Sequence, residues 1–157
     1  MSMYVAKINK DDVDTLLNLN DIIFNDQIKY SKEYIKKICE QRTGFIVYLD
    51  NVPAGYVFCD YHNNELIKKI VPTIMSIGVL EEYRRLGFGR TLLRSAIELF
   101  SEDIYLNVRE KNPGAQDLYT SEGFVMIGKI NKYYKLASGD EDAYVMVKFY
   151  EIDQALV

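Results

Sequence analysis

The chain has 157 residues and a formal net charge of -4 at pH 7; 48% of its residues are hydrophobic and 27% are charged. This length and composition predict one globular domain over residues 1–157 that can bury a core, and the acidic balance argues against a general nucleic-acid or membrane-surface binder. No apolar run reaches the roughly 18 residues that a membrane span needs, and the first residues lack the apolar core of a secretory signal.

The first half of the chain predicts a strand, two helices and a hairpin. Residues 4–8 alternate as a strand does, and Asn9 is placed to cap the helix that follows. Ser31 is placed to cap a second helix. The hydrophobic period then changes from that of a helix to that of a strand, and residues 45–49 and 54–61 predict a hairpin.

The second half predicts alternating strands and helices that end in two neighbouring strands. These elements are a long strand over 69–79, a helix over 91–100, a strand over 104–109, a short helix that Asn112 and Pro113 begin and Gly123 ends, and strands over 124–130 and 143–149 joined by a polar loop with tyrosines. The order β-α-α-β-β-β-α-β-α-β-β predicts an α/β fold, a mixed sheet of about seven strands with four helices on its two faces.

The cysteines and the histidine do not form a recognisable site. Cys39 and Cys59 lie in helical and strand patterns and outside any Cys-x-x-Cys, and His62 is the only histidine. We expect two buried reduced thiols, no metal site and a reducing, cytoplasmic compartment.

The turn Arg84-Arg85-Leu86-Gly87-Phe88-Gly89 carries the strongest functional signal. It lies between a predicted strand and a predicted helix, where unpaired helical N–H groups and the macrodipole favour an anion. Glycine at 87 and 89 lets a phosphate approach the backbone, and Arg90 and Arg94 add positive charge. A phosphorylated ligand is therefore predicted at this turn.

Two common phosphate loops are excluded. A dinucleotide-binding loop needs a third Gly or Ala where this chain has Leu92, and the Gly-Lys-Ser/Thr of a P-loop is absent. The pattern Arg-x-x-Gly-x-Gly resembles the acetyl-coenzyme A (acetyl-CoA) loop of the GNAT acyltransferases.

The resemblance extends over nearly the whole chain, since the order of elements is similar to the GNAT fold with its splayed fourth and fifth strands. The closest likeness is to protein N-terminal acetyltransferases of the NatE catalytic type, and it rests on four segments: 74–78, 83–89, Asn112 with Tyr119, and Lys132-Tyr133-Tyr134-Lys135. It implies transfer of an acetyl group from acetyl-CoA to the α-amine of a protein or peptide N-terminus, by direct attack in a ternary complex. It allows an auxiliary NatA-type subunit or the ribosome as a partner.

The resemblance also implies two sets of contact residues. Acetyl-CoA is expected to contact Ile77, Val79, Arg84, Arg85, Leu86, Gly87, Phe88, Gly89, Arg90, Asn112 and Tyr119. The acceptor peptide is expected to contact Phe24, Tyr30, Met75, Asn107, Tyr133 and Tyr134.

The catalytic groups are less complete than the binding groups. We expect Tyr119 to protonate the departing thiolate, because the ordinary pKa of a phenol, about 10, lies above the roughly 8.5 of a thiol. NatE-type enzymes carry a tyrosine and a histidine where this chain has Thr73 and Asn107, neither of which can act as a base, although both could order a water. Asp26 is the remaining candidate base.

Two alternatives stay open at this point. Loss of the tyrosine and histidine favours a weakly active or non-catalytic CoA-binding subunit of an N-terminal acetyltransferase complex. A small-molecule or polyamine acetyltransferase of the same fold is favoured by the acidic run 140–142 and opposed by the tyrosine pair, which narrows the cleft in the peptide-modifying family.

Overall fold

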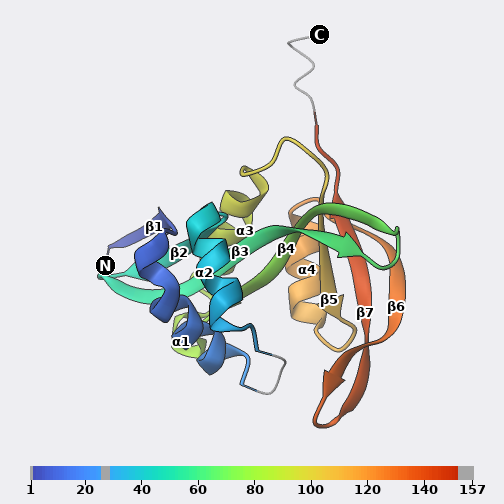
Figure 1. Ribbon diagram of the computed structural model, residues 1–157, viewed down its shortest axis with the longest axis horizontal. Coiled ribbons are helices and arrows are strands. Elements are labelled where there is room, and N and C mark those ends of the chain that lie inside the picture. Colours follow the sequence, from blue (N-terminus) through green and yellow to red (C-terminus); the bar gives the residue numbers. More distant parts are fainter. Residues whose placement is uncertain (1, 26–28, 152–157) are drawn as a thin grey trace.

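A seven-stranded sheet in the order β1-β2-β3-β4-β5-β7-β6 forms the centre of the computed structural model, which describes residues 2–25 and 29–151 (Figure 1). Neighbouring strands are antiparallel except for the parallel pair β4 and β5. The strands are β1 (Met3–Lys7), β2 (Gly44–Leu49), β3 (Val52–Asn64), β4 (Lys69–Val79), β5 (Ile104–Arg109), β6 (Val125–Leu136) and β7 (Gly139–Lys148).

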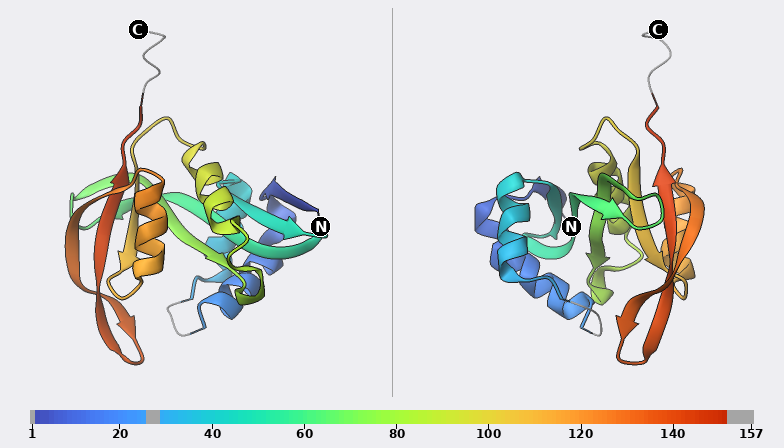
Figure 2. Two further views of the ribbon diagram at one scale, coloured as in Figure 1. Left: turned by 180° about the vertical axis from the view of Figure 1, so that it is seen from behind. Right: turned by 45° about the vertical axis from the view of Figure 1, so that its right-hand side comes forward.

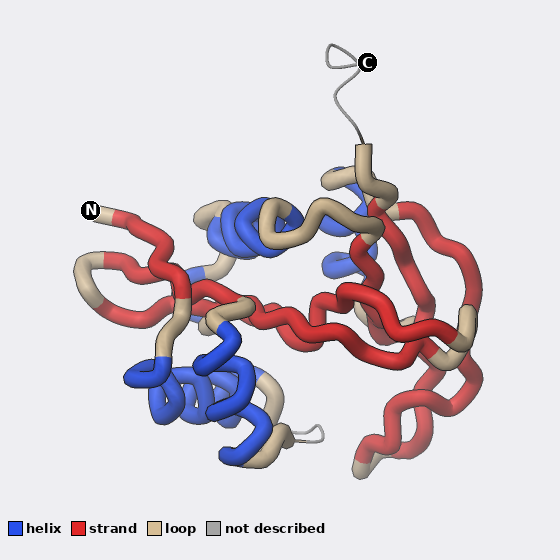
Figure 3. The backbone as a smooth tube through the Cα atoms, turned by 45° about the horizontal axis from the view of Figure 1, so that its top comes forward, coloured by secondary structure: helices blue, strands red, loops and turns tan. Residues whose placement is uncertain are grey.

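Helices cover both faces of the sheet (Figures 2 and 3). One face carries α1 (Val13–Ile23) and α2 (Lys32–Gln41), and the other carries α3 (Phe88–Ile97) and α4 (Pro113–Ser121). Two single 3-10 turns, η1 (Lys10–Asp12) and η2 (Glu81–Tyr83), precede α1 and α3. The predicted fold class, a mixed α/β sheet with four helices, is therefore confirmed.

The core has two layers because alternate residues of the central strands point to opposite faces. On β3, Tyr56 and Phe58 pack with α1 and α2, whereas Val57 and Cys59 pack with α3 and α4. A strand buried on both faces is apolar throughout, which explains the continuous hydrophobic run in β3. Cys39 and Cys59 are buried free thiols whose pKa values are raised by burial. None of the described helices is long and apolar enough to cross a membrane.

The predicted helix caps are present. The Asn9 side chain accepts a hydrogen bond from the N–H of Asp11 and forms a capping box with Asp12. Ser31 caps α2 through the N–H of Tyr34. The cap of α4 uses the Asn112 side chain, with proline at the next position.

The predicted boundaries of the final strands and of α3 were wrong. The final strands were expected to stop at 130 and to resume at 143, but β6 and β7 pair almost to the tip of the hairpin, at Leu136↔Gly139. A register shift between Ile130 and Tyr134, with a positive φ of 52° at Lys132, interrupts the alternation that marks a strand. Helix α3 begins at Phe88 and not at 91, so Gly89 lies in its first turn.

The sheet splits where the function was predicted. Strands β4 and β5 pair only at Thr73↔Tyr105 and Ile74↔Leu106, which confirms the expected splay. The β3–β4 ladder shifts register at the same level, leaving Met75 as the extra residue. From Met75 to Val79, β4 has no strand partner among the described residues on its β5 side, so this backbone edge is available to an extended ligand.

Candidate active site

A cavity of about 500 Å³ opens where β4 and β5 separate. Its lining comes from α1 and the α1–α2 connection, β4, β5, α4 and the final hairpin, together with the turn between β3 and β4. The lining residues are Asn20, Phe24, Tyr30, Glu65, Ile74, Met75, Ser76, Ile77, Leu106, Asn107, Val108, Arg109, Asn112, Ala115, Tyr119, Tyr133, Tyr134, Lys135 and Leu136.

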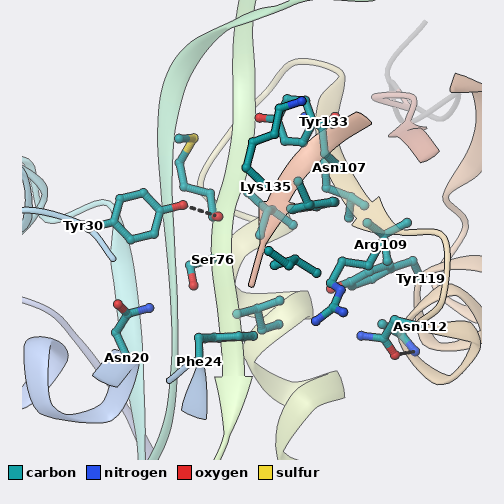
Figure 4. Close-up of a pocket in the computed structure, with 18 of the residues that line it drawn as sticks. Asn20, Phe24, Tyr30, Ser76, Asn107, Arg109, Asn112, Tyr119, Tyr133 and Lys135 are labelled. Carbon is teal, nitrogen blue, oxygen red and sulfur yellow. Dashed lines mark hydrogen bonds between the residues drawn. The ribbon is translucent and has the colours of Figure 1, made fainter. Parts of the chain in front are cut away.

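The cavity has two sides, divided by β4. Asn20, Tyr30 and Ser76 lie on one side of this strand, and Asn107, Tyr119 and Asn112 lie on the other (Figure 4). The structure thus brings together, in one cavity, every peptide-contact residue predicted from the sequence and, from the cofactor set, Ile77, Asn112 and Tyr119. Whether these residues bind the predicted ligands stays a prediction.

The turn before α3 forms an uncapped helix N-terminus. Gly87 is the N-cap with a φ of 82°, and none of the described side chains accepts a capping hydrogen bond from the first turn. The first backbone hydrogen bond of the helix runs from Thr91 to the Gly87 carbonyl, so the N–H groups before Thr91 face outward. Arg85 also has a positive φ, 66°, a costly conformation for a non-glycine residue that is typical of binding turns. Unpaired donors and a positive dipole end suit this turn to the predicted anion.

The arginines around this turn have different partners. Arg84 Nε donates to the Val79 carbonyl at 3.1 Å, which ties the turn to the end of β4. Arg90 instead pairs with Glu122, and its guanidinium donates to the Ser121 hydroxyl at 2.9 Å. Arg94 also pairs with Glu122, and together the two arginines lower the pKa of that carboxyl. Arg90 therefore anchors α3 to the end of α4, and its predicted contact with a pyrophosphate stays untested.

Tyrosines from the α1–α2 connection and from the final hairpin line the cavity. The Tyr30 hydroxyl donates to the Met75 carbonyl at 2.9 Å, so the carbonyl of the bulged residue is held by a side chain from the α1–α2 connection (Figure 4). Tyr133 and Tyr134 meet edge to face with ring centroids 5.0 Å apart. Burial raises the pKa values of Tyr30 and Tyr134, so both phenols stay protonated at neutral pH.

Asn107 and Thr73 differ in their relation to the cavity. Asn107 lines it, and its Oδ1 is buried without a hydrogen-bond partner among the described residues. Thr73 is 4% exposed, its hydroxyl donates to the Val71 carbonyl at 2.9 Å, and it does not line the cavity. The hypothesis that Thr73 orders a water in the site stays untested; its one proton is already bonded to its own strand.

Comparison with known proteins decides the family. A model of the acetyltransferase (GNAT) family matches residues 13–124. The chain belongs to this family. It is 29% identical over 150 residues to N-alpha-acetyltransferase 50 of Danio rerio, covering 92% of this chain and 86% of the relative. It is 32% identical over 148 residues to an N-alpha-acetyltransferase of Sulfurisphaera tokodaii, covering 86% of each.

Solved structures agree with this assignment. Arabidopsis thaliana Naa50 superposes with a TM-score of 0.79 at 25% identity, over 94% of this chain and 99% of the other. The ribosomal-protein-S18-alanine N-acetyltransferase of Escherichia coli has the same fold, with a TM-score of 0.81 at 21% identity over 99% of both chains. The predicted GNAT fold and the likeness to the NatE catalytic type are confirmed, and the chain is an acetyl-CoA-dependent N-acetyltransferase.

In this N-acetyltransferase, Tyr119 is suited to contact the leaving thiolate. It is 7% exposed and lies on α4 against Phe124, and its hydroxyl has no hydrogen bond to another described residue. Burial raises its pKa to about 12. The expectation that its proton passes downhill to a thiolate of pKa about 8.5 is wrong, because a proton moves downhill only toward the group of higher pKa; full transfer here costs about 5 kcal/mol. We therefore predict that Tyr119 donates a hydrogen bond to the developing thiolate. The proton that the thiolate finally takes up balances the one that the amine loses.

Other features of the site could not be identified from the sequence. The candidate base Asp26 lies outside the described residues. Glu65, from the turn between β3 and β4, is the one carboxylate among the described lining residues. Asn20 and Ser76 also line the cavity, and neither belongs to a motif that marks it. No group of three or more His, Cys, Asp or Glu side chains in the described ranges could hold a metal ion.

The final hairpin is held against β5 by Glu141. Its carboxylate accepts from Arg109 Nε and from another Arg109 nitrogen at 2.9 Å, and from the N–H of Lys111 at 3.0 Å. These hydrogen bonds, above all that of Arg109, hold the pKa of Glu141 below its ordinary value of 4.5. Since Glu141 pairs with Tyr134 across the hairpin, it fixes the strand that carries the tyrosine pair.

Glu141→Gln should lower the free energy of unfolding at pH 7 by about 2 kcal/mol, because charge-assisted hydrogen bonds are lost. A carboxyl with a lowered folded pKa stabilises the protein above pH 4.5, and this stabilisation is lost as the pH falls through the folded pKa. Urea unfolding at pH 3 to 7 measures the loss of unfolding free energy at pH 7 and its dependence on pH. Asp140→Asn is the control, since the Lys135–Asp140 pair of the same hairpin is exposed and should contribute below 1 kcal/mol. Equal losses in the two variants would contradict the anchoring role.

Asn107→Leu should stabilise the fold and slow turnover. A buried acceptor without a partner costs about 1–3 kcal/mol, and leucine of similar shape removes this cost. We expect the free energy of unfolding to rise by about 1 kcal/mol, while kcat/KM falls because the cavity loses a polar group. Thermal denaturation and steady-state kinetics check the two effects. A loss of stability would mean that the amide makes a stabilising contact.

Proposed function

We propose that this N-acetyltransferase transfers the acetyl group of acetyl-CoA to the free α-amine of a protein or peptide N-terminus, by direct attack in a ternary complex. The supporting observation is the single cavity shared by the two sides of β4. Tyr119, Asn112 and Tyr133 line it on one side of this strand, and Tyr30 lines it on the side of α1 (Figure 4). A donor and an acceptor can thus enter from different sides and meet where the strands separate.

The acetyl donor is proposed to bind along the free edge of β4 and on the α3 turn. The edge from Met75 to Val79 offers backbone groups to an extended ligand, as in strand addition. The outward N–H groups of the α3 turn suit a pyrophosphate. Among the relatives in structure, Arabidopsis thaliana NAA60 has been solved in complex with acetyl-CoA.

The α-amine is favoured over a lysine side chain by the lack of a base. The described lining residues include no histidine, their buried tyrosines stay protonated, and Glu65 is their one carboxylate. Deprotonating an α-amine of pKa near 8 costs about 1.4 kcal/mol at pH 7, whereas a lysine of pKa 10.4 costs about 4.6 kcal/mol. A site that relies on the neutral fraction of its substrate therefore prefers the α-amine.

The relatives support the same acceptor. The Danio rerio and Sulfurisphaera tokodaii proteins are named N-alpha-acetyltransferases, and Arabidopsis thaliana Naa50 has been solved with the bisubstrate analogue CoA-Ac-MVNAL. An auxiliary subunit or the ribosome stays a predicted partner. A non-catalytic CoA-binding role is the second candidate, because Thr73 is not among the lining residues and Asn107 has no titrating group.

A peptide array with varied first residues, incubated with labelled acetyl-CoA, tests the proposal. Each peptide is paired with a copy whose N-terminus is blocked and which carries one lysine. We expect label on the free N-termini and little on the blocked copies. CoA binding without turnover would support the non-catalytic role, and faster turnover on spermidine than on any peptide would support a polyamine acetyltransferase.

A further inference from the structure

A buried chain of three polar side chains connects α1, β3 and β4 and reaches the cavity. Tyr56 on β3 is 0% exposed. The Asn20 amide Nδ2, on α1, donates to its hydroxyl at 2.9 Å, and the same hydroxyl lies 2.6 Å from the Ser76 Oγ on β4. Asn20 and Ser76 both line the cavity (Figure 4). The reaction described so far uses none of these three side chains.

The direction of the hydrogen bonds follows from counting protons. A phenol has one proton to donate and also accepts through its oxygen. Since Asn20 donates to that oxygen, the Tyr56 proton is left for Ser76, the other group bonded to it. A fully buried hydroxyl needs such a partner. The Ser76 oxygen therefore accepts from Tyr56, and its own proton is free to be donated into the cavity.

The position of Ser76 limits what it can contact. It lies on the same side of β4 as Tyr30 and Asn20, opposite Tyr119 (Figure 4). A donor is poorly matched to the reacting amine, because the ammonium form has no lone pair and the neutral form needs its lone pair for attack. It is well matched to an oxygen next to the amine, and in a peptide that oxygen is the carbonyl of the first residue.

We propose, building on the proposed N-terminal acetylation, that the Ser76 hydroxyl donates a hydrogen bond to the first carbonyl oxygen of the acceptor peptide. Asn20 and Tyr56 are positioning residues, since they act by fixing the direction of this hydroxyl. A simple amine or polyamine has no such oxygen. The three side chains therefore discriminate between a peptide N-terminus and a free amine.

The test compares two acceptors on several variants of the full chain. One acceptor is a pentapeptide that the wild type acetylates, and the other is the same peptide with an (E)-alkene in place of its first peptide bond. We expect the kcat/KM ratio of the two acceptors to shrink about fivefold in Ser76→Ala and in Tyr56→Phe, with an unchanged KM for acetyl-CoA. The two acceptors differ in amine pKa, but this difference cancels when their kcat/KM ratio is compared between variants, because every variant is assayed with the same two acceptors.

Two further variants separate a lost contact from general damage. Ser76→Thr keeps the hydroxyl and should keep the wild-type ratio. Thr73→Val removes a buried hydroxyl from the same strand, away from the cavity, and should also keep it. A wild type without activity on any peptide would overturn the proposed function itself. A wild-type ratio in Ser76→Ala would overturn this inference alone, whether or not Tyr56→Phe folds.

Discussion

Tyr119→Phe should lower kcat by about 10- to 100-fold and leave the Kd for acetyl-CoA unchanged. The change removes only the hydroxyl, and the ring that packs against Phe124 remains. A hydrogen bond to a charged group contributes about 1.5–3 kcal/mol, and this one forms only as charge develops on sulfur. Initial-rate assays at saturating substrates measure kcat, and calorimetric titration with acetyl-CoA measures Kd.

The pH profile distinguishes a hydrogen-bond donor from a titrating acid. Because burial raises the pKa of Tyr119 to about 12, the phenol stays protonated up to strongly alkaline pH. Ionisation of Tyr119 should therefore not lower kcat between pH 7 and pH 10. The wild type and Tyr119→Phe should show the same pH dependence of kcat in this range. Tyr105→Phe, which removes a hydroxyl on the neighbouring strand outside the cavity lining, is the control and should keep wild-type kcat. An unchanged kcat in Tyr119→Phe would exclude its role at the thiolate.

Local signals in the sequence were sufficient to predict the order of elements. Caps at Asn9, Ser31 and Asn112 and the glycine turn before α3 depend on neighbouring residues, and each was found where it was expected. The extended β6–β7 hairpin was missed because its irregular middle hides the strand alternation. Patterns of period two and 3.6 therefore locate regular elements and fail at bulges.

The site was less accessible to prediction because its contacts join distant residues. Ser76 bonds to a tyrosine 20 positions away, and Arg90 pairs with a carboxylate 32 positions away. Glu65 reaches the cavity because the β3–β4 hairpin extends to Asn64, where a turn follows. Contacts of this kind depend on strand register, which a single sequence constrains only weakly. The resemblance supplied the predicted binding residues, and only the structure shows which of them have other partners.

Alanine substitutions at the two glycines of the α3 turn should have different effects on acetyl-CoA binding and on stability. A Cβ added at Gly89 would meet only Leu118 Cδ2, at 3.5 Å, an ordinary contact, and Gly89 lies within a helix. Gly89→Ala should therefore raise the free energy of unfolding by up to about 0.5 kcal/mol, since alanine is the better helix former. The same methyl group would stand where a phosphate approaches the helical N–H groups. We expect the Kd for acetyl-CoA to rise at least tenfold, measured by calorimetric titration and compared with thermal denaturation.

Gly87→Ala should lower both the stability of the fold and the affinity for acetyl-CoA. A second glycine with a positive φ serves as the control. A Cβ at Gly87 meets nothing within 4 Å, but the φ of 82° is strained for alanine by about 1–2 kcal/mol. Gly139, at the tip of the final hairpin, has a φ of 121° and equally open surroundings. Gly139→Ala should thus lose similar stability while acetyl-CoA affinity stays at the wild-type value. If Gly89→Ala binds acetyl-CoA as tightly as the wild type, the phosphates do not rest on this turn, because that variant alone changes the binding surface without straining the backbone.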